Sequence, residues 1–342
     1  MSKVLTIALD VMGGDHGPDV VLPAALRFLK KRDDFKLLLV GDRDVIEAGL
    51  KNLGAADNAR LDIQHASQSV EMDELPSRAL RFKKDSSMRV AIDMVKEGRA
   101  QACVSAGNTG ALMATARFVL KTLPGIDRPA ICTSLPSITG HTWMLDLGAN
   151  IDSSAQHLFQ FGLMGSVLAR AVDGNPSPKV GLLNIGEEEM KGNDTIREAA
   201  ALLAASPLNY VGFVEGDDIY TGKVDVVACD GFVGNISLKS TEGAAKLIYH
   251  FIKREFTRNI FTRLAALVAM PVLKAFQKQV DPRRYNGASL LGLRGSVIKS
   301  HGGADALAFS SAIEVAAVVV ERNVPELISS QLQSAMVERQ VV

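Results

Sequence analysis

The sequence lacks any excess of charge of either sign. Its 342 residues carry 38 basic and 38 acidic side chains, so the formal net charge at pH 7 is zero. A neutral chain has no overall electrostatic attraction to nucleic acid or to an anionic membrane. We therefore expect no nucleic acid partner, and any contact with a membrane must come from a local patch.

Cysteine is scarce, and its arrangement argues against disulfide bonds. The three cysteines, Cys103, Cys132 and Cys229, are odd in number, lie in apolar runs and match no metal-binding spacing. This pattern predicts three cysteines buried in strands of a protein from a reducing compartment. A cysteine nucleophile at Cys229 is disfavoured, because the carboxylate of the adjacent Asp230 raises the pKa of a thiol.

Long apolar runs and several familiar motifs are also missing. No uninterrupted apolar run approaches the length of a membrane span, and the N-terminal apolar segment is too short for a signal peptide. The chain has no Gly-x-Gly-x-x-Gly after a strand, no Walker A motif, no Gly-x-Ser-x-Gly and no His-Glu-x-x-His. A dinucleotide fold, a P-loop enzyme, a serine hydrolase and a zincin therefore lack their usual support, and we predict a cytosolic protein.

Short apolar segments followed by glycine-rich polar loops recur along the chain, and most of these loops lead into helical patterns. This alternation predicts a three-layer α/β/α fold with a mostly parallel, doubly wound sheet. A 47% hydrophobic fraction supplies a large core, and we predict one catalytic domain over residues 1–342. The loops should leave one edge of the sheet and converge on one crevice. The predicted strands are residues 4–9, 37–40, 61–65, 102–105, 142–147, 179–185, 210–214 and 224–229.

The loop that follows the strand at residues 179–185 carries an unusual concentration of charge. Three carboxylates, at residues 187–189, precede the amine of Lys191 in a loop that also contains two glycines. Thr195, with Glu198 three residues later, predicts a capping box at the start of the next helix. Packing does not require such a loop, so it is a candidate functional site. The three acids themselves fit either contacts that shape the loop or solvent-exposed charge.

Two more loops, residues 105–110 and 230–235, place backbone amides and small polar side chains at predicted helix starts. Unpaired amides and the helix dipole at such positions favour an anion, which indicates a phosphate cradle. The alternative is a tight turn that needs glycine for a positive φ. Several such loops in one chain favour the cradle.

Histidines and aspartates supply further candidates. His16 and His301 are each flanked by glycine, which suits a site residue better than the strand and helix contexts of the other histidines, although such a histidine also often only bonds backbone. Asp10, Asp146 and Asp230 each end a predicted strand and together are a possible Mg²⁺ set. Because metal geometry requires distances that a sequence does not give, we expect no metal.

Residues 246–281 interrupt the alternation with a predicted helical hairpin. Apolar residues recur there at helical spacing, and Pro271 predicts two helices that meet near Met270. Basic side chains far outnumber the single acid, Glu255, so the hairpin is a positive patch on a neutral protein. The basic residues are Lys246, Lys253, Arg254, Arg258, Arg263, Lys274 and Lys278.

The loop motifs together resemble the bacterial phosphate acyltransferases (PlsX), which are acyl-ACP:phosphate transacylases, over nearly the whole chain. The motifs that carry the resemblance are Asp10-Val-Met-Gly-Gly-Asp15 with Pro18, Ser105-Ala-Gly-Asn-Thr-Gly-Ala111, Leu145-Asp-Leu-Gly-Ala-Asn150, Asn184-Ile-Gly-Glu-Glu188 with Lys191-Gly192, Asp230-Gly-Phe-Val-Gly-Asn235, Tyr285-Asn-Gly-Ala288, Leu290-Leu-Gly-Leu293 and Lys299-Ser-His-Gly302.

This resemblance implies a fold like that of isocitrate and isopropylmalate dehydrogenases and phosphotransacetylases, a homodimer, and transfer of a fatty acyl group from acyl carrier protein to inorganic phosphate without a cofactor. The acyl phosphate would feed a downstream glycerol-3-phosphate acyltransferase in phospholipid synthesis. The implied catalytic residues are Lys191 and Asn235. The implied substrate-binding residues are Asp10, Gly13, Gly14, Asp15, His16, Ser105, Gly107, Asn108, Thr109, Asn150, Asp230, Gly231, Gly234 and His301.

These residue types suit the implied reaction. Phosphate is already anionic near pH 7, so the enzyme has to hold a charged nucleophile in line with the thioester carbon rather than supply a strong base. Lys191 would provide the counter-charge, while Asn235, Asn108 or a loop amide would stabilise the tetrahedral oxyanion. Because carboxylates flank Lys191, the amides of the Gly107 and Gly234 loops must supply part of the site.

The hairpin has three compatible roles: a dimer bundle, a dock for the acidic carrier protein, and an apolar tip at residues 264–273 that enters an anionic membrane surface. The membrane role would associate part of the cytoplasmic protein with the inner face of the membrane. The residues predicted to make carrier-protein or membrane contacts are Arg254, Arg258, Arg263, Leu264, Leu267, Val268, Met270 and Lys274.

Three other functions stay open at this point. A nicotinamide-dependent hydroxyacid dehydrogenase of the same fold would reduce NAD or NADP. A phosphotransacetylase would use acyl-CoA in place of acyl carrier protein. A non-enzymatic scaffold for lipid synthesis would tolerate replacement of the loop lysine and asparagines.

Overall fold

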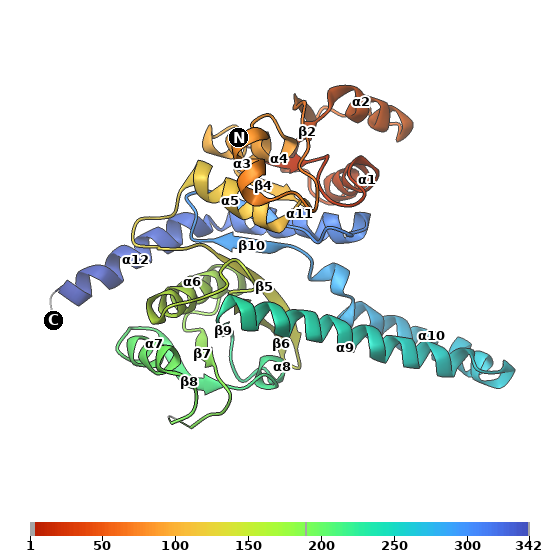
Figure 1. The fold of residues 1–342 in the computed structure, drawn as a ribbon. Coiled ribbons are helices and arrows are strands. Elements are labelled where there is room, and N and C mark those ends of the chain that lie inside the picture. The colour runs from red at the N-terminus through yellow and green to blue at the C-terminus, as the bar shows by residue number, and fades with distance from the viewer. Residues whose placement is uncertain (1–3, 189, 341–342) are drawn as a thin grey trace.

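A single twisted β-sheet forms the centre of the computed structural model, which describes residues 4–188 and 190–340 (Figure 1). Within these residues eleven strands follow the order β3-β2-β1-β4-β11-β10-β5-β6-β9-β7-β8. The strands are β1 (Leu5–Asp10), β2 (Phe35–Gly41), β3 (Leu61–His65), β4 (Ala102–Ser105), β5 (Ala130–Ser137), β6 (Gly140–Leu145), β7 (Lys179–Leu183), β8 (Asn209–Val214), β9 (Val226–Ala228), β10 (Ala288–Leu291) and β11 (Ser296–Lys299).

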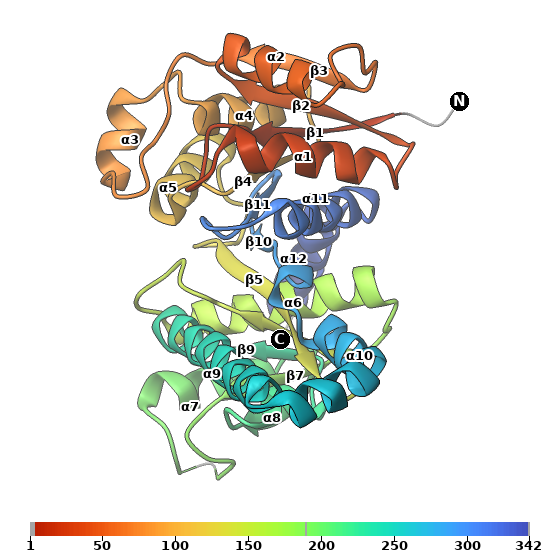
Figure 2. The ribbon, with the colours of Figure 1, turned by 90° about the vertical axis from the view of Figure 1, so that its right-hand side faces the viewer.

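Helices cover both faces of this sheet, which confirms the predicted three-layer α/β/α architecture (Figure 2). Along β1, Ile7 and Leu9 join one apolar cluster while Ala8 joins the other, as the two-residue period of a strand buried on both faces requires. The helices are α1 (Pro18–Leu29), α2 (Arg43–Asn52), α3 (Pro76–Phe82), α4 (Ser87–Lys96), α5 (Thr109–Leu120), α6 (Ala155–Asp173), α7 (Asp194–Ala204), α8 (Asp218–Thr221), α9 (Gly231–Thr257), α10 (Ile260–Val280), the 3₁₀ turn η1 (Pro282–Arg284), α11 (Ala306–Glu321) and α12 (Val324–Gln340).

The sheet contains two parallel groups that run in opposite directions. Strands β3, β2, β1, β4 and β11 are parallel to one another, and so are β6, β9, β7 and β8. Three antiparallel pairings, β11 with β10, β10 with β5 and β5 with β6, reverse the direction between the groups. The expectation that all loops leave one common edge is therefore wrong. The loops form two sets, one for each group, which we call the first and second loop sets.

The sequence did not predict strands β5, β10 and β11. Each of the three antiparallel pairings involves at least one of these strands. Both β10 and β11 have only four residues, and Gly292 and Gly295 lie between them. Periodicity over so few residues is weak evidence for a strand. The prediction of a mostly parallel sheet is confirmed, but the reversal depended on the strands that were missed.

The hairpin is longer than its sequence pattern indicated, and its turn lies elsewhere. Helices α9 and α10 meet at Arg258 and Asn259, and they lie side by side as they project from the body of the protein (Figure 1). The Asn259 side chain accepts a hydrogen bond from the backbone of Thr262 and so begins α10. Pro271 lies inside α10, so the prediction that two helices meet near Met270 is wrong.

No single described helix is both long and apolar enough to cross a membrane. Residues Gly231–Thr257 and Ile260–Phe276 meet the length and composition criteria only as a pair, and that pair is bent by 119°. The sequence predicted an apolar tip of the hairpin at residues 264–273. These residues lie along α10 rather than at the distal turn.

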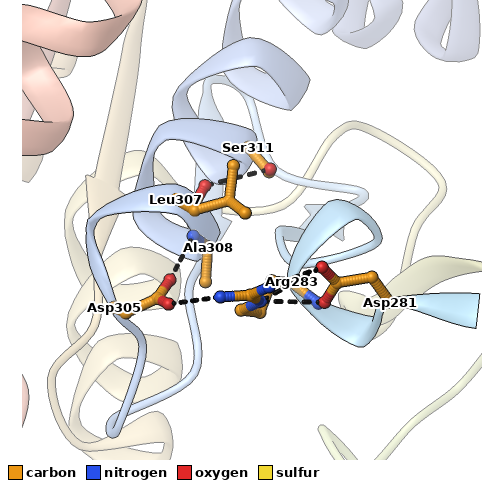
Figure 3. A network of polar contacts seen from close by, with 6 residues as sticks. All are labelled: Asp281, Arg283, Asp305, Leu307, Ala308 and Ser311. Atoms are coloured by element: carbon orange, nitrogen blue, oxygen red, sulfur yellow. Dashed lines mark hydrogen bonds and ion pairs between the residues drawn. The ribbon is translucent and has the colours of Figure 1, made fainter. Parts of the chain in front are cut away.

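A charged clamp fixes the base of the hairpin to the remainder of the fold (Figure 3). The Arg283 guanidinium, in η1, lies 2.8 Å from the Asp281 carboxylate and 3.0 Å from Asp305. Asp305 also caps α11, because its other carboxylate oxygen accepts a hydrogen bond of 2.8 Å from the Ala308 amide. The segment that returns from α10 is thereby tied to the start of α11.

The first turn of α9 packs closely against the loop that follows β6, and two glycines permit this approach. A Cβ atom on Gly231 would overlap the Asn150 carbonyl oxygen and lie 2.5 Å from the Asp146 carboxylate. A Cβ atom on Gly234 would overlap the Asp146 carbonyl oxygen and lie 2.8 Å from Cys229 Sγ. Close packing therefore accounts for both glycines without a ligand.

Gly234→Ala should destabilise the protein, because the added methyl group would meet backbone that cannot move without disturbing β6 and β9. We expect a loss of about 1–3 kcal/mol in the free energy of unfolding, typical of overpacking. Gly243→Ala is the matched control in the same helix, since a Cβ there meets nothing within 4 Å. That control should be neutral or stabilising by about 1 kcal/mol. Equal urea midpoints for the two variants would contradict the packing explanation.

Candidate functional site

The first loop set contains a buried polar junction at the carboxyl ends of β1, β4 and β11. Asp10 ends β1 and is fully buried, and its Oδ2 accepts a 2.6 Å hydrogen bond from Ser105 Oγ at the end of β4. Ser105 Oγ in turn accepts a 3.0 Å hydrogen bond from the Gly107 amide. The parallel pairing of β1 with β4 places these side chains next to each other.

Burial raises the pKa of Asp10, and hydrogen bonds from Ser105 and Ser87 offset only part of that rise. Among the described residues, no group donates a hydrogen bond of good length and angle to Asp10 Oδ1. A buried, incompletely paired carboxylate is costly for folding. Such a group is more typical of a functional site than of a packing core.

Two glycines bring the loop after β1 against its neighbours. A Cβ on Gly13 would overlap Asp10 Oδ2. Gly14 has φ +88°, and a Cβ there would lie 2.8 Å from Ala106 Cβ and 3.0 Å from the Gly302 carbonyl oxygen. The Asp15 amide donates a 3.0 Å hydrogen bond to the same Gly302 oxygen. The loops after β1, β4 and β11 therefore form one packed unit, while the side chains of Asp15 and His16 are exposed.

Lys299, at the end of β11, belongs to this unit and was missed as a site residue by the sequence interpretation. Its Nζ donates to the carbonyl oxygens of Ala106, at 3.2 Å, and Ser300. Burial lowers the pKa of Lys299 to about 8, against the opposing influence of Asp10 and Asp15. One sequence signal could have identified Lys299 as a site residue: it ends a short apolar run directly before Ser-His-Gly.

His301 is held in one tautomer by its own loop. Its Nδ1 accepts a 3.1 Å hydrogen bond from the Gly303 amide, so in the neutral ring the proton is on Nε2. Its amide donates to Asn286 Oδ1 at 3.0 Å. Burial, reinforced by nearby lysines, lowers the pKa of His301, so the ring is neutral at pH 7 and offers Nε2–H as a donor.

Asn108 serves mainly to shape its loop. Its Oδ1 caps α5 by accepting a 3.0 Å hydrogen bond from the Ala111 amide. Its Nδ2 donates to the carbonyl oxygens of Met72 and Glu74 at 2.8 and 3.0 Å. Both ends of the side-chain amide are therefore engaged, which makes Asn108 a weak candidate for an oxyanion donor. Thr109 follows as the exposed first residue of α5.

The second loop set is organised by Asp146, which follows β6. Its carboxylate accepts hydrogen bonds from the amides of Ile131, Ala149 and Asn150 and from Asn150 Nδ2. Asp230 caps α9 through a 2.9 Å hydrogen bond from the Phe232 amide. Asp146, Asn150 and Asp230 thus all have structural hydrogen bonds.

Asn235 differs from these residues. It lies exposed on the first turns of α9, beside Gly148, and no described hydrogen bond occupies its side-chain amide. Asn235 is therefore the predicted residue of this set that is most available to a substrate.

Lys191 lies in the loop between β7 and α7. Its Nζ forms a 2.8 Å ion pair with Glu188, and hydrogen bonding to this carboxylate raises the pKa of Lys191. Asn193, rather than the predicted Thr195, caps α7, through a 2.9 Å hydrogen bond from the Ile196 amide. Asparagine is as effective an N-cap as serine or aspartate, and it comes two residues earlier.

The structure separates Lys191 from the first loop set. Strands β7 and β9 are parallel neighbours, so the loop of Lys191 leaves the same edge as the loop of Gly234. The Gly107 loop joins β4 to α5 in the other group of strands, and these elements lie in the upper half of both views, whereas β7 and α7 lie in the lower half (Figures 1 and 2). The expected joint contribution of the Gly107 and Gly234 loops next to Lys191 stays a prediction.

The candidate Mg²⁺ ligands are also divided between the two sets, with Asp10 in the first and Asp146 and Asp230 in the second. Among the described residues no group of three or more His, Cys, Asp or Glu side chains is placed to hold a metal ion. All three cysteines are buried as predicted, and burial raises the pKa of each thiol.

Comparison with solved structures shows a shared fold. A phosphotransacetylase from Streptococcus pyogenes aligns with a TM-score of 0.64 and 18% identity, and the alignment covers 95% of each chain. The EutD phosphotransacetylase from Staphylococcus aureus aligns with a TM-score of 0.58 and 18% identity over 91% of this chain and 94% of its own. The architecture is therefore the one found in phosphotransacetylases.

Sequence comparison shows the family. The model of the family described as fatty acid synthesis protein matches residues 5–327. Phosphate acyltransferases from Nitrosococcus oceani and Alkalilimnicola ehrlichii are 62% and 59% identical over 339 and 340 residues, and each alignment covers 99% of both sequences. One from Methylococcus capsulatus is 60% identical over 98% of both. The chain is an acyltransferase enzyme, and it belongs to the phosphate acyltransferase family.

Lys299 should make the stability of the protein depend on alkaline pH. Its folded pKa of about 8 lies below the ordinary 10.5, so between these values the unfolded chain binds more protons and stability rises with pH. At about 1.4 kcal/mol for each pH unit, the wild type should gain about 3 kcal/mol over Lys299→Met across this range. Urea unfolding at several pH values measures the difference. A difference that stays constant from pH 8 to 10.5, as we expect for the exposed control Lys51→Met, would contradict the assignment.

Proposed function

We propose that the enzyme transfers a fatty acyl group from acyl-[acyl carrier protein] to inorganic phosphate and so forms acyl phosphate for phospholipid synthesis. The observation that supports this most directly is near-complete alignment with phosphate acyltransferases at 59–62% identity. The buried junction of Asp10, Ser105 and Lys299 adds support, since it places a low-pKa amine and the Gly107 amide at the ends of parallel strands.

The proposed reaction is a direct displacement. A phosphate oxygen attacks the thioester carbonyl carbon and forms a C–O bond, while the C=O electrons move to the oxygen. The tetrahedral intermediate then collapses and the C–S bond breaks, so that the carrier protein leaves as a thiolate. A thiol pKa near 8.5 makes this departure easy, and ionised phosphate needs no base. Orientation and stabilisation of the oxyanion are the contributions required from the protein.

Asn235 is the proposed oxyanion donor, because its side-chain amide is exposed and unoccupied, whereas both ends of the Asn108 amide are engaged. Lys191 is the proposed counter-charge for phosphate in the second loop set. The Glu188 carboxylate neutralises Lys191 in this conformation, so phosphate binding there requires the exposed ion pair to open. Water screens an exposed ion pair and leaves it weak, so this opening costs little free energy.

Purified protein incubated with acyl carrier protein thioester and phosphate should yield acyl phosphate, detected by mass spectrometry. Lys191→Ala and Asn235→Ala should each reduce turnover by at least about a hundredfold, as loss of an oxyanion donor typically does, with unchanged melting temperatures. Lys223→Ala provides the control, because it removes another exposed, paired lysine near the same edge. Near-normal turnover in either variant would refute the role given to that residue.

The acyl donor is the second question, because the fold is shared with phosphotransacetylases. We expect turnover with the acyl carrier protein thioester to exceed turnover with acyl-CoA of the same chain length. A clear preference for acyl-CoA would replace the proposed donor and retain transfer to phosphate.

We propose that the hairpin provides the contact surfaces of the enzyme: a homodimer interface, a carrier-protein dock and a peripheral attachment to the anionic inner membrane surface, close to a glycerol-3-phosphate acyltransferase. Helix α10 exposes a row of large apolar side chains, including Leu267 at 65% and Val268 at 85% exposure. Arg254, Arg258 and Arg263 lie around the distal turn. An apolar face bordered by cations suits an anionic membrane surface.

Leu267→Glu should weaken association with anionic liposomes without reducing turnover in solution, because it places a charge in the apolar face and leaves both loop sets unchanged. Vesicle co-sedimentation measures the association. Ile138→Glu is the control, since Ile138 is an exposed apolar residue in the turn between β5 and β6, outside the hairpin. If Leu267→Glu sediments like the wild type, the membrane contact lies elsewhere.

A further inference from the structure

A basic surface surrounds the carboxyl-terminal end of α5, at the opposite end of this helix from the Gly107 loop. It contains an open depression of about 450 Å³ that is lined by Ala114, Arg117, Phe118, Lys121 and Thr122. Arg294, from the loop between β10 and β11, lies at the rim, because its Nε donates a 3.1 Å hydrogen bond to the Thr122 carbonyl oxygen. No role was predicted for these residues from the sequence.

An aromatic ring lies in this depression. Phe118 is 52% exposed, although aromatic side chains are usually buried. Lys121 Nζ lies 4.8 Å from the centroid of the ring, and the guanidinium of Arg89, from α4, lies 5.7 Å from it. Exposed aromatic and arginine side chains are enriched in protein interfaces. The depression therefore has the composition of a protein contact surface.

The cations of this surface are incompletely neutralised. Arg89 pairs with Asp93 at 2.9 Å, whereas Arg117, Lys121 and Arg294 form no ion pair with any described carboxylate. Residues 76–121, which include α3, α4 and α5, contain nine basic and three acidic side chains in a chain without net charge. The dipole of α5 favours cations at its end, but Arg294 comes from a separate loop. The surface therefore attracts an anionic partner.

The backbone of Lys121 supplies an independent observation. Its φ is 64° and its ψ is 166°, a conformation that only glycine adopts readily. Glycine is also the usual residue directly after a helix. A lysine at this position costs stability, and such strain is typical of functional sites. The Lys121 side chain therefore has a role that folding does not explain.

The surface lies at the same edge of the sheet as the second loop set. Strands β6 and β10 both end where β5 begins. The Leu123 amide, directly after the depression, donates a 2.9 Å hydrogen bond to the Gly292 carbonyl oxygen that follows β10. A few residues later the Pro129 carbonyl oxygen accepts a 2.9 Å hydrogen bond from Asn150 Nδ2 of the second loop set. Residues 122–130 thus connect the basic surface to that loop set.

We propose that this basic surface docks an acidic helix of the acyl carrier protein. Carboxylates of that helix pair with Arg117, Lys121 and Arg294, while one of its apolar side chains enters the depression and covers Phe118. A concave surface fits a projecting helix better than it fits a flat lipid layer. The inference deepens the proposed function and rests on it for the identity of the partner.

Docking at this edge delivers the thioester to the side of the sheet from which the loops of Lys191 and Asn235 leave. The hairpin, the other surface proposed for this partner, is formed by different elements. Variants in the two surfaces therefore distinguish them.

Binding is measured by calorimetric titration of the full-length enzyme with unacylated acyl carrier protein. Arg117→Glu and Arg294→Glu should each lower the affinity at least about tenfold, because they place like charges opposite each other. Lys51→Glu, in the exposed part of α2, should match the wild type. Absence of wild-type binding, or loss of affinity only in the hairpin variant Arg258→Glu, would overturn the inference.

Lys121→Gly separates docking from folding. Glycine accepts the backbone conformation, so the melting temperature should rise, while loss of the amine should weaken binding of the carrier protein. Lys121→Arg keeps the charge and should keep most of the affinity. A lower melting temperature or an unchanged affinity in Lys121→Gly would contradict the role given to Lys121.

Other occupants of the surface predict different results for Arg117→Glu. Sedimentation with anionic liposomes and the oligomeric state should both match the wild type. Loss of liposome binding would assign the surface to a membrane, and loss of self-association would assign it to a second copy of this chain. Either result would overturn the proposed dock.

The titrations contain neither thioester nor phosphate, so they are independent of the proposed acyl transfer. Binding that depends on Arg117, together with absence of acyl phosphate in the turnover assay, would retain the dock and reject the reaction. In that assay Arg117→Glu should raise the KM for the carrier protein thioester and leave kcat unchanged. Acyl phosphate formation with a wild-type KM would retain the reaction and reject the dock.

Discussion

The burial of Asp10 is the constraint on which the first loop set depends. A carboxylate without access to water requires donors, and among the described residues these are Ser105, Ser87 and the backbone amides that follow β1. Gly13 and Gly14 are small because the loop must pass directly over this carboxylate and against the β11 loop. Lys299, also partly buried, adds the opposite charge at the cost of a lowered pKa. Burying these groups costs stability, and it holds the polar groups of the site in fixed positions.

The reversal of the sheet is the second determinant of the architecture. It divides the polar loops into two sets, with Asp10 and Lys299 in the first and Lys191 and Asn235 in the second. Helix α9 begins at the second set and carries Asn235 on its first turns. The close packing of its first turn through Gly231 and Gly234 fixes the direction in which it leaves the sheet.

The fold class, the long strands and the loops of the site followed from the sequence, because apolar runs that end in Asp10, Ser105 or Asp146 are strong local signals. The strands β10 and β11 were not found, since four residues carry too little periodicity, and with them Lys299 was missed as a site residue. The sequence placed the boundary between the two helices near Pro271 rather than at Asn259, because proline is a strong signal for a helix end. The exposed helix α10 nevertheless contains this proline.

The hairpin is connected to the candidate site at both of its ends. Helix α9 starts at the second loop set and carries Asn235, while the return from α10 is clamped by Arg283 to Asp305, four residues after His301. At 1.5 Å per residue, α9 is a rod of about 40 Å. Tilting such a rod by a few degrees displaces its distal turn by several ångströms and its first turns by only a fraction of one. A contact at the distal turn therefore acts on the first turns of α9, which carry Asn235, through a long rigid arm.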